Sequence, residues 1–335
     1  MRRRQLLSAL ALLPATAWAS TLPPPVHGLP GRVRLAGTAG MMPVVAAWKR
    51  AFETANPAIR VDVAMAGSDV AMANLYAATC DIALIGREAT KPEIQAFEWI
   101  YRFRPRGVAV LGGSVATPGR SPALAAMVHR SNPLASISID GLAAAFGDGA
   151  QQARTWGDLG LDGAWRDLGL DGAWRDRPIH LYAPEAESGS GRFFRAAVLN
   201  GSNRMAWPRL REYTVPPRPA KAEAEAAIAM RRALARDPAG LGIGIAGKEI
   251  KTLPLIGANG IALLPDAASV GAGTYPLGRT VQAYHAAPAK TPVHPETLAF
   301  LRFMMTPEAQ AIAGRASDYL PLSAGAAQEA RAALG

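Results

Sequence analysis

The sequence predicts an α/β protein of two lobes, in which each lobe is a mainly parallel sheet flanked by helices and a two-strand hinge joins the lobes. Two observations lead to this prediction. The chain of 335 residues is longer than one hydrophobic core comfortably serves. In addition, apolar strands alternate with amphipathic helices along most of its length, which is typical of α/β folds. We place lobe 1 at residues 33–112 and 275–335, and lobe 2 at residues 113–274.

The first lobe begins with an alternation of three strands and two helices. Short apolar segments predict strands, and segments with an apolar residue at every third or fourth position predict helices. The strands are expected at 32–37, 59–67 and 81–86, and loop-helix segments are expected at 38–57 and 68–79. We expect Ser68 to cap the second helix, and Thr90 and Glu93 to form a capping box at the start of a third.

Two segments are expected to connect the lobes. A strand at 106–117 is broken by Gly112 and Gly113, which suits a crossing into the second lobe. A second set of strands and helices follows. A strand at 274–286 and two helices at 294–315 then complete the first lobe. Lobe 1 is thus built from both ends of the sequence, with lobe 2 inserted between them. The chain must then cross between the lobes twice, which implies a hinge architecture.

The N-terminus has the features of an export signal. Residues 1–19 combine three arginines, an apolar run and small residues at the cleavage position, so we expect cleavage after Ala19. The apolar run is too short to span a bilayer. Arg3 and Arg4 leave both the Sec and the twin-arginine route open. We therefore expect a soluble, periplasmic mature protein with a Pro-rich leader at 20–32.

Charge and cysteine content argue against several other classes. The formal net charge is +10, and removal of the three signal arginines lowers it to +7. The remaining basic residues are scattered arginines without interleaved aromatics, so we expect a solvated basic surface that attracts anions, and no nucleic-acid partner. Cys80 is the only cysteine, which excludes an internal disulfide and a lipid anchor at the cleavage site.

Three places share one local design, in which small hydroxyl residues and glycines meet a helix start. Thr38, Ala39 and Gly40 follow the first strand, Gly67 and Ser68 follow the second, and Ser188, Gly189, Ser190 and Gly191 precede a helix in lobe 2. Free backbone N–H groups and the helix dipole favour anions at such positions. Each alone is explained by helix capping. Together they predict a site for a tetrahedral or carboxylate anion in the crevice at the strand ends.

The same residues offer little support for an enzyme. Ser190 lies in G-S-G and not in the G-x-S-x-G motif of a nucleophile elbow. The five histidines have no zinc-site spacing, and His180 is interpreted as structural. A hydrolase with Ser188 or Ser190 as nucleophile remains an alternative that lacks an adjacent base. We expect no catalytic residue, no metal and no cofactor.

Several motifs, in the same order along the chain, resemble the phosphate-binding protein of bacterial phosphate ABC importers, a type II periplasmic binding protein. They are GTAGM at 37–41, GSDVAMANLYAATCDIALIGREATKPE at 67–93, HRSNPLASISIDGLAAAFG at 129–147, ESGSGRFF at 187–194 and FLRFMMTPEAQAIAGRASDYLPL at 300–322. The resemblance runs from about Val33 to Leu322.

The resemblance implies a hinge-closing receptor that holds inorganic phosphate between its lobes and presents it to an inner-membrane ABC permease. We expect it to act as a monomer. The ligand-holding positions of the family correspond here to Thr38 and the Ala39 amide, to Ser68, and to the turn of Ser188, Gly189 and Ser190.

Two departures from the family pattern concern the ligand. Family members place Ser or Asp after the third strand, where this chain has Gly86, and the family arginine ahead of the Ser-Gly-Ser turn is missing. Arg87 or Arg192 could supply a guanidinium fork for the oxyanion. Asp69 and Glu187 are the nearest candidates for a carboxylate that accepts the proton of hydrogen phosphate and so disfavours sulfate. The alternative is a non-transporting exported scaffold or signalling relative with a degenerate anion site.

A nine-residue unit, DLGLDGAWR, occurs twice in succession at 158–166 and 167–175. The repeated D-x-G-x-D-G partly imitates a calcium loop, but the twelfth position is Gly169 or Pro178 where a bidentate Glu is needed. The resemblance to the family accounts for one copy. We therefore expect a tandem duplication tolerated in a surface loop at 158–175.

Overall fold

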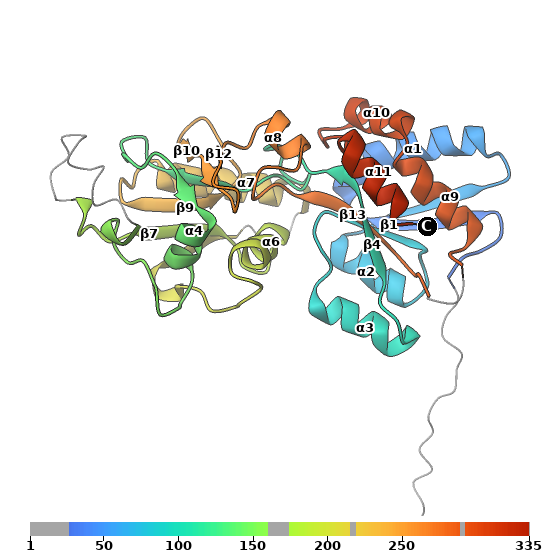
Figure 1. Ribbon diagram of the computed structural model, residues 1–335, viewed down its shortest axis with the longest axis horizontal. Coiled ribbons are helices and arrows are strands. Elements are labelled where there is room, and N and C mark those ends of the chain that lie inside the picture. The colour runs from blue at the N-terminus through green and yellow to red at the C-terminus, as the bar shows by residue number, and fades with distance from the viewer. Residues whose placement is uncertain (1–26, 160–173, 215–218, 289–291, 335) are drawn as a thin grey trace, which may run out of the picture.

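The computed structural model describes residues 27–159, 174–214, 219–288 and 292–334. The expected signal peptide, most of the leader and most of the repeated loop lie outside these ranges. The chain forms two lobes that lie end to end, with lobe 1 on the right and lobe 2 on the left in Figure 1. Each lobe has its own sheet and its own hydrophobic core, which confirms the predicted fold class.

The sheet of lobe 1 has five strands in the order β2-β1-β3-β13-β4. These are β1 (Arg32–Gly37), β2 (Arg60–Met65), β3 (Ile82–Ile85), β4 (Arg106–Gly112) and β13 (Thr280–His285). β1 pairs in parallel with β2 and β3, whereas β13 is antiparallel to both of its neighbours. The late strand β13 thus enters the middle of a sheet whose other strands all run the same way.

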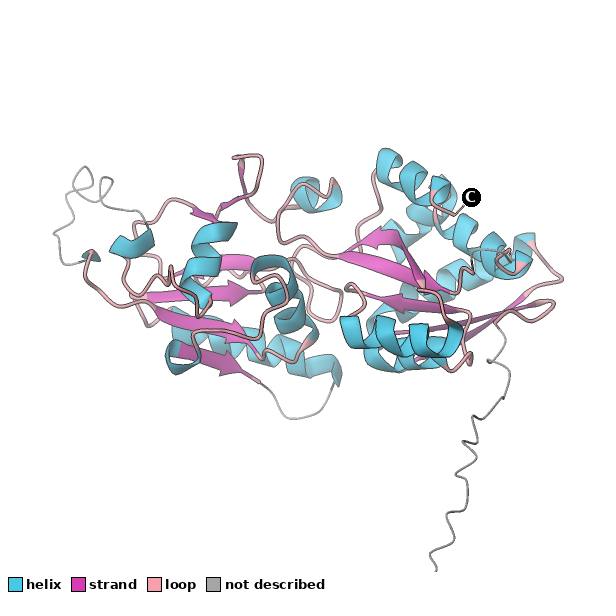
Figure 2. Cartoon of the chain, turned by 60° about the horizontal axis from the view of Figure 1, so that its bottom comes forward, coloured by secondary structure: helices cyan, strands magenta, loops and turns pink. Residues whose placement is uncertain are grey.

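Helices cover both faces of this sheet, as Figure 2 shows. They are α1 (Met42–Ala55), α2 (Ser68–Tyr76), α3 (Lys91–Tyr101), α9 (Pro295–Met304), α10 (Pro307–Ala316) and α11 (Ala324–Ala332). One core lies between the sheet and α1, α9 and α10, around the fully buried Trp48 and Phe300. A second core, around Met72 and Phe97, lies under α2 and α3. The inner strand β3 is buried along its whole length because helices cover both faces of the sheet.

Two predicted helix starts had different outcomes. The capping box of Thr90 and Glu93 at the start of α3 is confirmed. The prediction that Ser68 caps α2 is wrong, because Gly67 takes the cap position and Ser68 is the first helical residue. Gly67 has φ 133°, a conformation open to glycine, and it allows the chain to turn from β2 directly into the helix.

The sheet of lobe 2 has five strands in the order β10-β5-β9-β7-β8, beside a small sheet β12-β11-β6. The strands are β5 (Ala125–Val128), β6 (Ile137–Ser138), β7 (His180–Pro184), β8 (Leu210–Tyr213), β9 (Gly240–Gly244), β10 (Lys251–Leu253), β11 (Leu255–Ile256) and β12 (Ala262–Leu263). The helices include α4 (Ile139–Phe146), α6 (Gly189–Val198), α7 (Pro219–Leu234) and α8 (Ala267–Gly271). β7 runs parallel to β8 and β9, and β5 is the antiparallel strand of this sheet.

Two segments cross between the lobes, one between β4 and β5 and the other between α8 and β13. They are hydrogen-bonded to each other, since Gly113 N donates to Arg279 O at 2.6 Å and Leu124 N donates to Leu277 O at 3.1 Å. Tyr275 and Leu277 pack in the core of lobe 2. The second crossing therefore ends at about Arg279, slightly later than the expected boundary at residue 275.

The ends of the repeated loop meet in a narrow neck. Gly157 N donates to Arg175 O at 2.9 Å, and Trp156 N donates to Arg177 O at 3.1 Å. The ring of Trp174 packs edge-on against the buried Trp156 at a centroid distance of 6.3 Å. Most of the partial calcium-loop pattern lies outside the described residues. Asp158, its first residue, accepts hydrogen bonds from Arg154 N and Thr155 N at 2.8 Å each, and so closes the turn.

Candidate functional site

A cavity of about 740 Å³ lies between the lobes, where the strands of lobe 1 end and helices of both lobes begin. Six of the eight residues predicted to bind a ligand line it. Thr38, Ala39 and Ser68 come from lobe 1, and Ser188, Gly189 and Ser190 come from lobe 2. Three segments far apart in the sequence are thus brought together at one place.

The lobe 1 side is built from two strand ends. Thr38 follows β1 in an extended conformation, and its carbonyl accepts the Met41 N–H at 2.9 Å to start a short 3-10 helix at Ala39–Met41. Ser68 opens α2 directly after Gly67. The first N–H groups of a helix have no acceptor within the helix, and the helix dipole makes this end partly positive. Lobe 1 thus presents a hydroxyl residue and helix-start amides at each strand end.

On the lobe 2 side, the two serines have different environments. Ser188 is the N-cap of α6, where its Oγ accepts from Gly191 N at 3.0 Å and donates to Glu185 O at 2.6 Å. Its hydroxyl is therefore engaged in the cap. The buried Ser190 Oγ donates to Glu223 Oε1 at 2.8 Å and accepts from Arg279 Nη1 at 3.3 Å. Ser190 is consequently the hydroxyl of this turn that belongs to a polar network inside the cavity.

Arg279, which the sequence analysis did not single out, supplies a buried guanidinium to the cavity. Its Nη2 and Nε donate to Gly86 O at 2.7 and 3.1 Å, and its Nη1 reaches Ser190. Burial lowers the pKa of Arg279 to about 10, partly offset by the charge of Glu223. The side chain therefore stays cationic at neutral pH and links a strand end of lobe 1 to the helix start of lobe 2.

Ser121 explains the absence of a side chain at Gly86. A Cβ placed on Gly86 would lie 1.7 Å from Ser121 Oγ and 2.9 Å from Ser121 Cβ, so the space after β3 is already taken. Ser121 lies in the first crossing segment and has φ 48°, a left-handed conformation that is unusual for serine. Both Gly86 and Ser121 line the cavity. The space after β3 is thus occupied by a serine side chain from the crossing segment.

Glu223 brings a carboxylate into the same cavity from α7. Its Oε2 accepts from Gly119 N at 2.6 Å, in addition to the bond from Ser190 to Oε1. Glu223 is in an Ala-rich helix whose sequence gives no indication of a site, and Gly119 is in the crossing segment. The carboxylate thus accepts hydrogen bonds from a backbone amide and a hydroxyl, the kinds of donor that bind an oxyanion.

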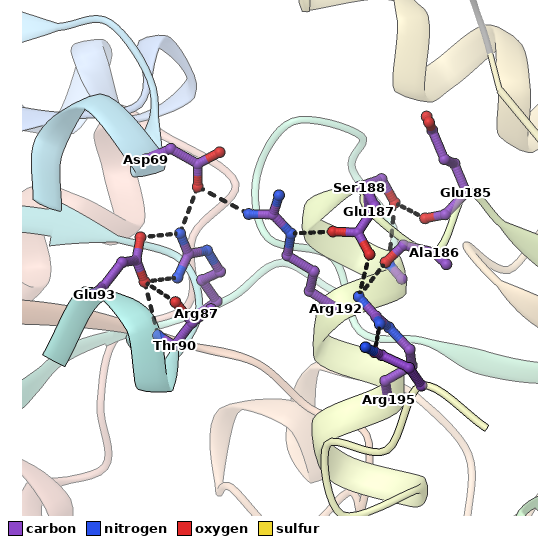
Figure 3. A network of polar contacts seen from close by, with 12 residues as sticks. Asp69, Arg87, Thr90, Glu93, Glu185, Ala186, Glu187, Ser188, Arg192 and Arg195 are labelled. Atoms are coloured by element: carbon purple, nitrogen blue, oxygen red, sulfur yellow. Dashed lines mark hydrogen bonds and ion pairs between the residues drawn. The ribbon is translucent and has the colours of Figure 1, made fainter. Parts of the chain in front are cut away.

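Arg87 and Arg192 do not line the cavity, contrary to the expectation that one of them faces the ligand. The Arg87 guanidinium is buried and bonds both Glu93 oxygens, at 2.7 and 2.8 Å, as well as Asp69 Oδ1 at 2.6 Å (Figure 3). Burial opposes the charge of Arg87, but the hydrogen bonds to Glu93 and Asp69 outweigh it and raise its pKa. The hydrogen bonds of the Arg87 guanidinium are thus made to acceptors within lobe 1.

Arg192 instead joins the two lobes. Its Nη1 lies 3.1 Å from Asp69 Oδ1 across the lobe boundary, and its Nε lies 3.3 Å from Glu187 on its own side (Figure 3). Glu187 is also paired with Arg195 at 2.8 Å. Asp69 and Glu187, the carboxylates expected near the ligand, are therefore members of an interlobe ion-pair network that we call the Asp69–Arg192 bridge.

The described residues contain no group of three or more His, Cys, Asp or Glu side chains that could hold a metal ion. His180, interpreted as structural, pairs through Nδ1 with Asp237 at 2.7 Å. No helix in the described part of the chain combines the length and the apolar character that crossing a membrane requires.

Comparison with known proteins connects this geometry to a family. The model of the PBP superfamily domain matches residues 24–308. The curated phosphate-binding protein PstS of Pseudomonas aeruginosa is 25% identical over 318 residues, covering 92% of this chain and 88% of its own. Protein SphX of Synechococcus elongatus is 27% identical over 286 residues, covering 82% and 75%.

Solved structures support the fold. An ABC-type phosphate transport receptor from Vibrio cholerae aligns with a TM-score of 0.54 and 17% identity, covering 86% of this chain and 99% of its own. PstS from Borrelia burgdorferi aligns with a TM-score of 0.54 and 15% identity, covering 87% and 99%. At this level of identity the structures establish the two-lobed fold. The match of the domain model over most of the chain shows more: this protein belongs to the PBP superfamily.

Proposed function

We propose that this protein is an exported solute-binding protein, which captures a small oxyanion between its two lobes and delivers it to an inner-membrane ABC importer. Inorganic phosphate is the first candidate ligand. The observation that carries the proposal is the convergence of helix starts from both lobes, at Ser68 and Ser190, on a cavity that contains the buried cation of Arg279. The names of the curated relatives agree with it.

The proposed mechanism is binding without turnover. Fixed amides at the helix starts and the hydroxyls of Thr38, Ser121 and Ser190 would surround the anion, and the guanidinium of Arg279 would neutralise part of its charge. These donors belong to different lobes and to both crossing segments, so a bound anion favours the arrangement in which the lobes are together. We expect a monomer to suffice, because one chain supplies all of these groups.

Glu223 gives a physical reason for selecting a protonated anion. Its carboxylate can accept a hydrogen bond from the hydroxyl of hydrogen phosphate, but it repels sulfate, which has no proton at neutral pH. Glu223 lines the cavity, whereas Asp69 and Glu187 are engaged in the Asp69–Arg192 bridge. We therefore expect phosphate and arsenate to bind more tightly than sulfate.

The test is thermal unfolding of the mature protein, stripped of ligand by unfolding and refolding, in the presence of phosphate, arsenate, sulfate, molybdate and small carboxylates. A ligand at one hundred times its Kd adds about 2.7 kcal/mol to the free energy of unfolding. We expect this response to phosphate and a weaker one to sulfate. A protein that responds to none of these anions would contradict the proposal.

The second candidate function is a non-transporting exported scaffold or signalling protein. It was suggested by Gly86 and by the missing family arginine, but Ser121 and Arg279 occupy the cavity with the same chemical groups. The two candidates differ in the effect of Ser68→Ala combined with Ser190→Ala. A receptor loses anion affinity and transport in the cell, whereas a scaffold keeps its cellular function.

A further inference from the structure

The cavity between the lobes is larger than a bare oxyanion needs. Its volume is about 740 Å³. Allowing ~30 Å³ for each heavy atom, the share of one molecule in liquid water, an inorganic phosphate with five such atoms fills about 150 Å³. Pockets that hold organic ligands of drug size have volumes of roughly 300–1,000 Å³. The size of this cavity thus falls in the range of organic ligands.

The space beyond the polar groups has an apolar wall. Glu223, Ala226, Ala227 and Met230 line the cavity from α7, and their spacing of three and four residues places them on one face of the helix. Met230 is fully buried and lies against Gly244 of β9, where an added Cβ would be 2.5 Å from its methyl group. Beyond Glu223, therefore, this helix face presents only methyl groups and a thioether.

Further apolar groups line the cavity away from α7. Met65 at the end of β2, Tyr213 at the end of β8 and Ile245 after β9 all contribute. Amides and hydroxyls at the helix starts thus form one part of the cavity, and apolar side chains from both lobes form another. A site for a bare phosphate needs donors on every side of the ion, and this one has them on only part of its surface.

The volume does not result from lobes that are far apart. Arg192 of lobe 2 lies 3.1 Å from Asp69 of lobe 1. Arg279 bonds Gly86 of lobe 1 and Ser190 of lobe 2, at 2.7 and 3.3 Å. The cavity therefore persists while the lobes are joined at two places.

We infer that the ligand is a tetrahedral oxyanion that carries an organic substituent, a phosphonate or a phosphate monoester. Its charged head lies at the helix starts of α2 and α6 beside Arg279, and its substituent lies against Ala226, Ala227 and Met230 of α7. This inference rests on the proposed function and narrows its substrate class. Both anions keep oxygen acceptors on a tetrahedral phosphorus, and burial of the apolar substituent adds the affinity that a bare ion cannot gain there.

Isothermal titration of the ligand-stripped mature protein tests this directly. The probes are inorganic phosphate, methylphosphonate, phenylphosphonate and phenyl phosphate. We expect phenylphosphonate or phenyl phosphate to bind at least ten times more tightly than inorganic phosphate, and their comparison separates the phosphonate from the monoester. Inorganic phosphate binding as tightly as both phenyl compounds, or more tightly, overturns the inference and leaves the proposed function standing. Failure of all four probes to bind also overturns the inference, and the thermal unfolding with arsenate, sulfate, molybdate and small carboxylates then decides whether the proposed function stands.

A pair of matched variants locates the substituent. Ala226→Leu adds three carbon atoms on the cavity face of α7, and Ala229→Leu adds the same atoms on the same helix at an exposed position that does not line the cavity. We expect Ala226→Leu to weaken phenylphosphonate at least tenfold while phosphate changes less than twofold, and Ala229→Leu to change neither. Equal losses for both ligands in Ala226→Leu, or no loss for phenylphosphonate, contradict the placement. The wild-type titrations test the ligand class even if Ala226→Leu does not fold.

Discussion

The guanidinium of Arg192 on lobe 2 and the carboxylate of Asp69 on lobe 1 form an ion pair across the lobe boundary, with Nη1 and Oδ1 3.1 Å apart. Asp69 is also held by Arg87 at 2.6 Å, so the acceptor is fixed before the lobes meet. Neither residue lines the cavity. The pair can therefore stabilise the joined lobes without contacting the ligand.

Arg192→Ala should weaken ligand binding modestly. Both side chains are partly exposed, and exposed ion pairs contribute about 0.2–1 kcal/mol, so the loss of affinity should not exceed about fivefold. The measurement is the Kd at low ionic strength and at 1 M salt, where screening should remove the difference. Arg204→Ala, an exposed arginine of lobe 2 outside the network, is the control. A loss that persists at 1 M salt would mean that Arg192 contacts the ligand.

Gly86→Ala should lower the free energy of unfolding by about 1–3 kcal/mol, because the new methyl group overlaps Ser121. Ser121→Gly removes the overlapping atoms and suits the left-handed conformation at that position. In the double variant, most of the lost stability should return. Urea unfolding of the four proteins gives the coupling energy. Additive effects would show that the two residues are not packed as the structure has them.

Arg279→Gln should weaken anion binding by about ten- to a hundredfold, the equivalent of a charged hydrogen bond of about 1.5–3 kcal/mol. Arg279→Lys keeps a charge but loses the fork that spans Gly86 and Ser190, so an intermediate affinity is expected. Titration with phosphate measures both. Wild-type affinity in Arg279→Gln would remove this residue from the site.

Acid should destabilise the protein through His285, which is fully buried in β13. Burial lowers its pKa to about 4, against 6.5 in an unfolded chain. Between these values the unfolded state binds more protons, so this contribution to stability is lost as pH falls from about 6.5 to 4, by up to about 3 kcal/mol. His285→Gln should flatten the pH dependence of urea unfolding over this interval. An unchanged slope in His285→Gln would contradict this account.

Deletion of residues 167–175 should leave folding and ligand binding intact. The neck uses Asp158 at the start of the first copy and Trp174 and Arg175 at the end of the second. Because the two copies are identical, the deletion moves Trp165 and Arg166 into the positions that Trp174 and Arg175 occupy now. Thermal unfolding and phosphate titration check this. Deletion of both copies removes the neck and should destabilise lobe 2, and equal stability of the two deletions would disprove the argument.

Local patterns predicted much of the fold and part of the site. The strand and helix alternation, the two crossings and the capping box at Thr90 follow from residue order over short windows, and the structure has all of them. The hydroxyl-rich helix starts were equally visible. Ser68 was misplaced by one position because a serine suggests a cap, whereas the glycine before it alone can adopt the required φ.

The missed residues share a different cause. Arg279, Ser121 and Glu223 reach the cavity through tertiary contacts between segments that are distant in sequence, and none stands in a recognisable motif. A signal existed for Arg279, a single arginine at the point where the chain re-enters lobe 1. For Ser121 the signal was the empty position at Gly86, which shows that some other group must fill that space. Arg87 and Arg192 were predicted to bind the ligand because of their charge. Sequence spacing could not show that their guanidinium groups pair with carboxylates of the protein instead.

Ser121 and Arg279 belong to the two segments that connect the lobes, and both line the cavity. A ligand in this cavity would contact the connecting segments themselves. The affinity for the ligand and the angle between the lobes could therefore not vary independently. Changes in the stiffness of the loop at 114–121, which includes Ser121, would then alter the rate of ligand release without removing any donor. The two connecting segments are therefore both the hinge between the lobes and a part of the cavity wall.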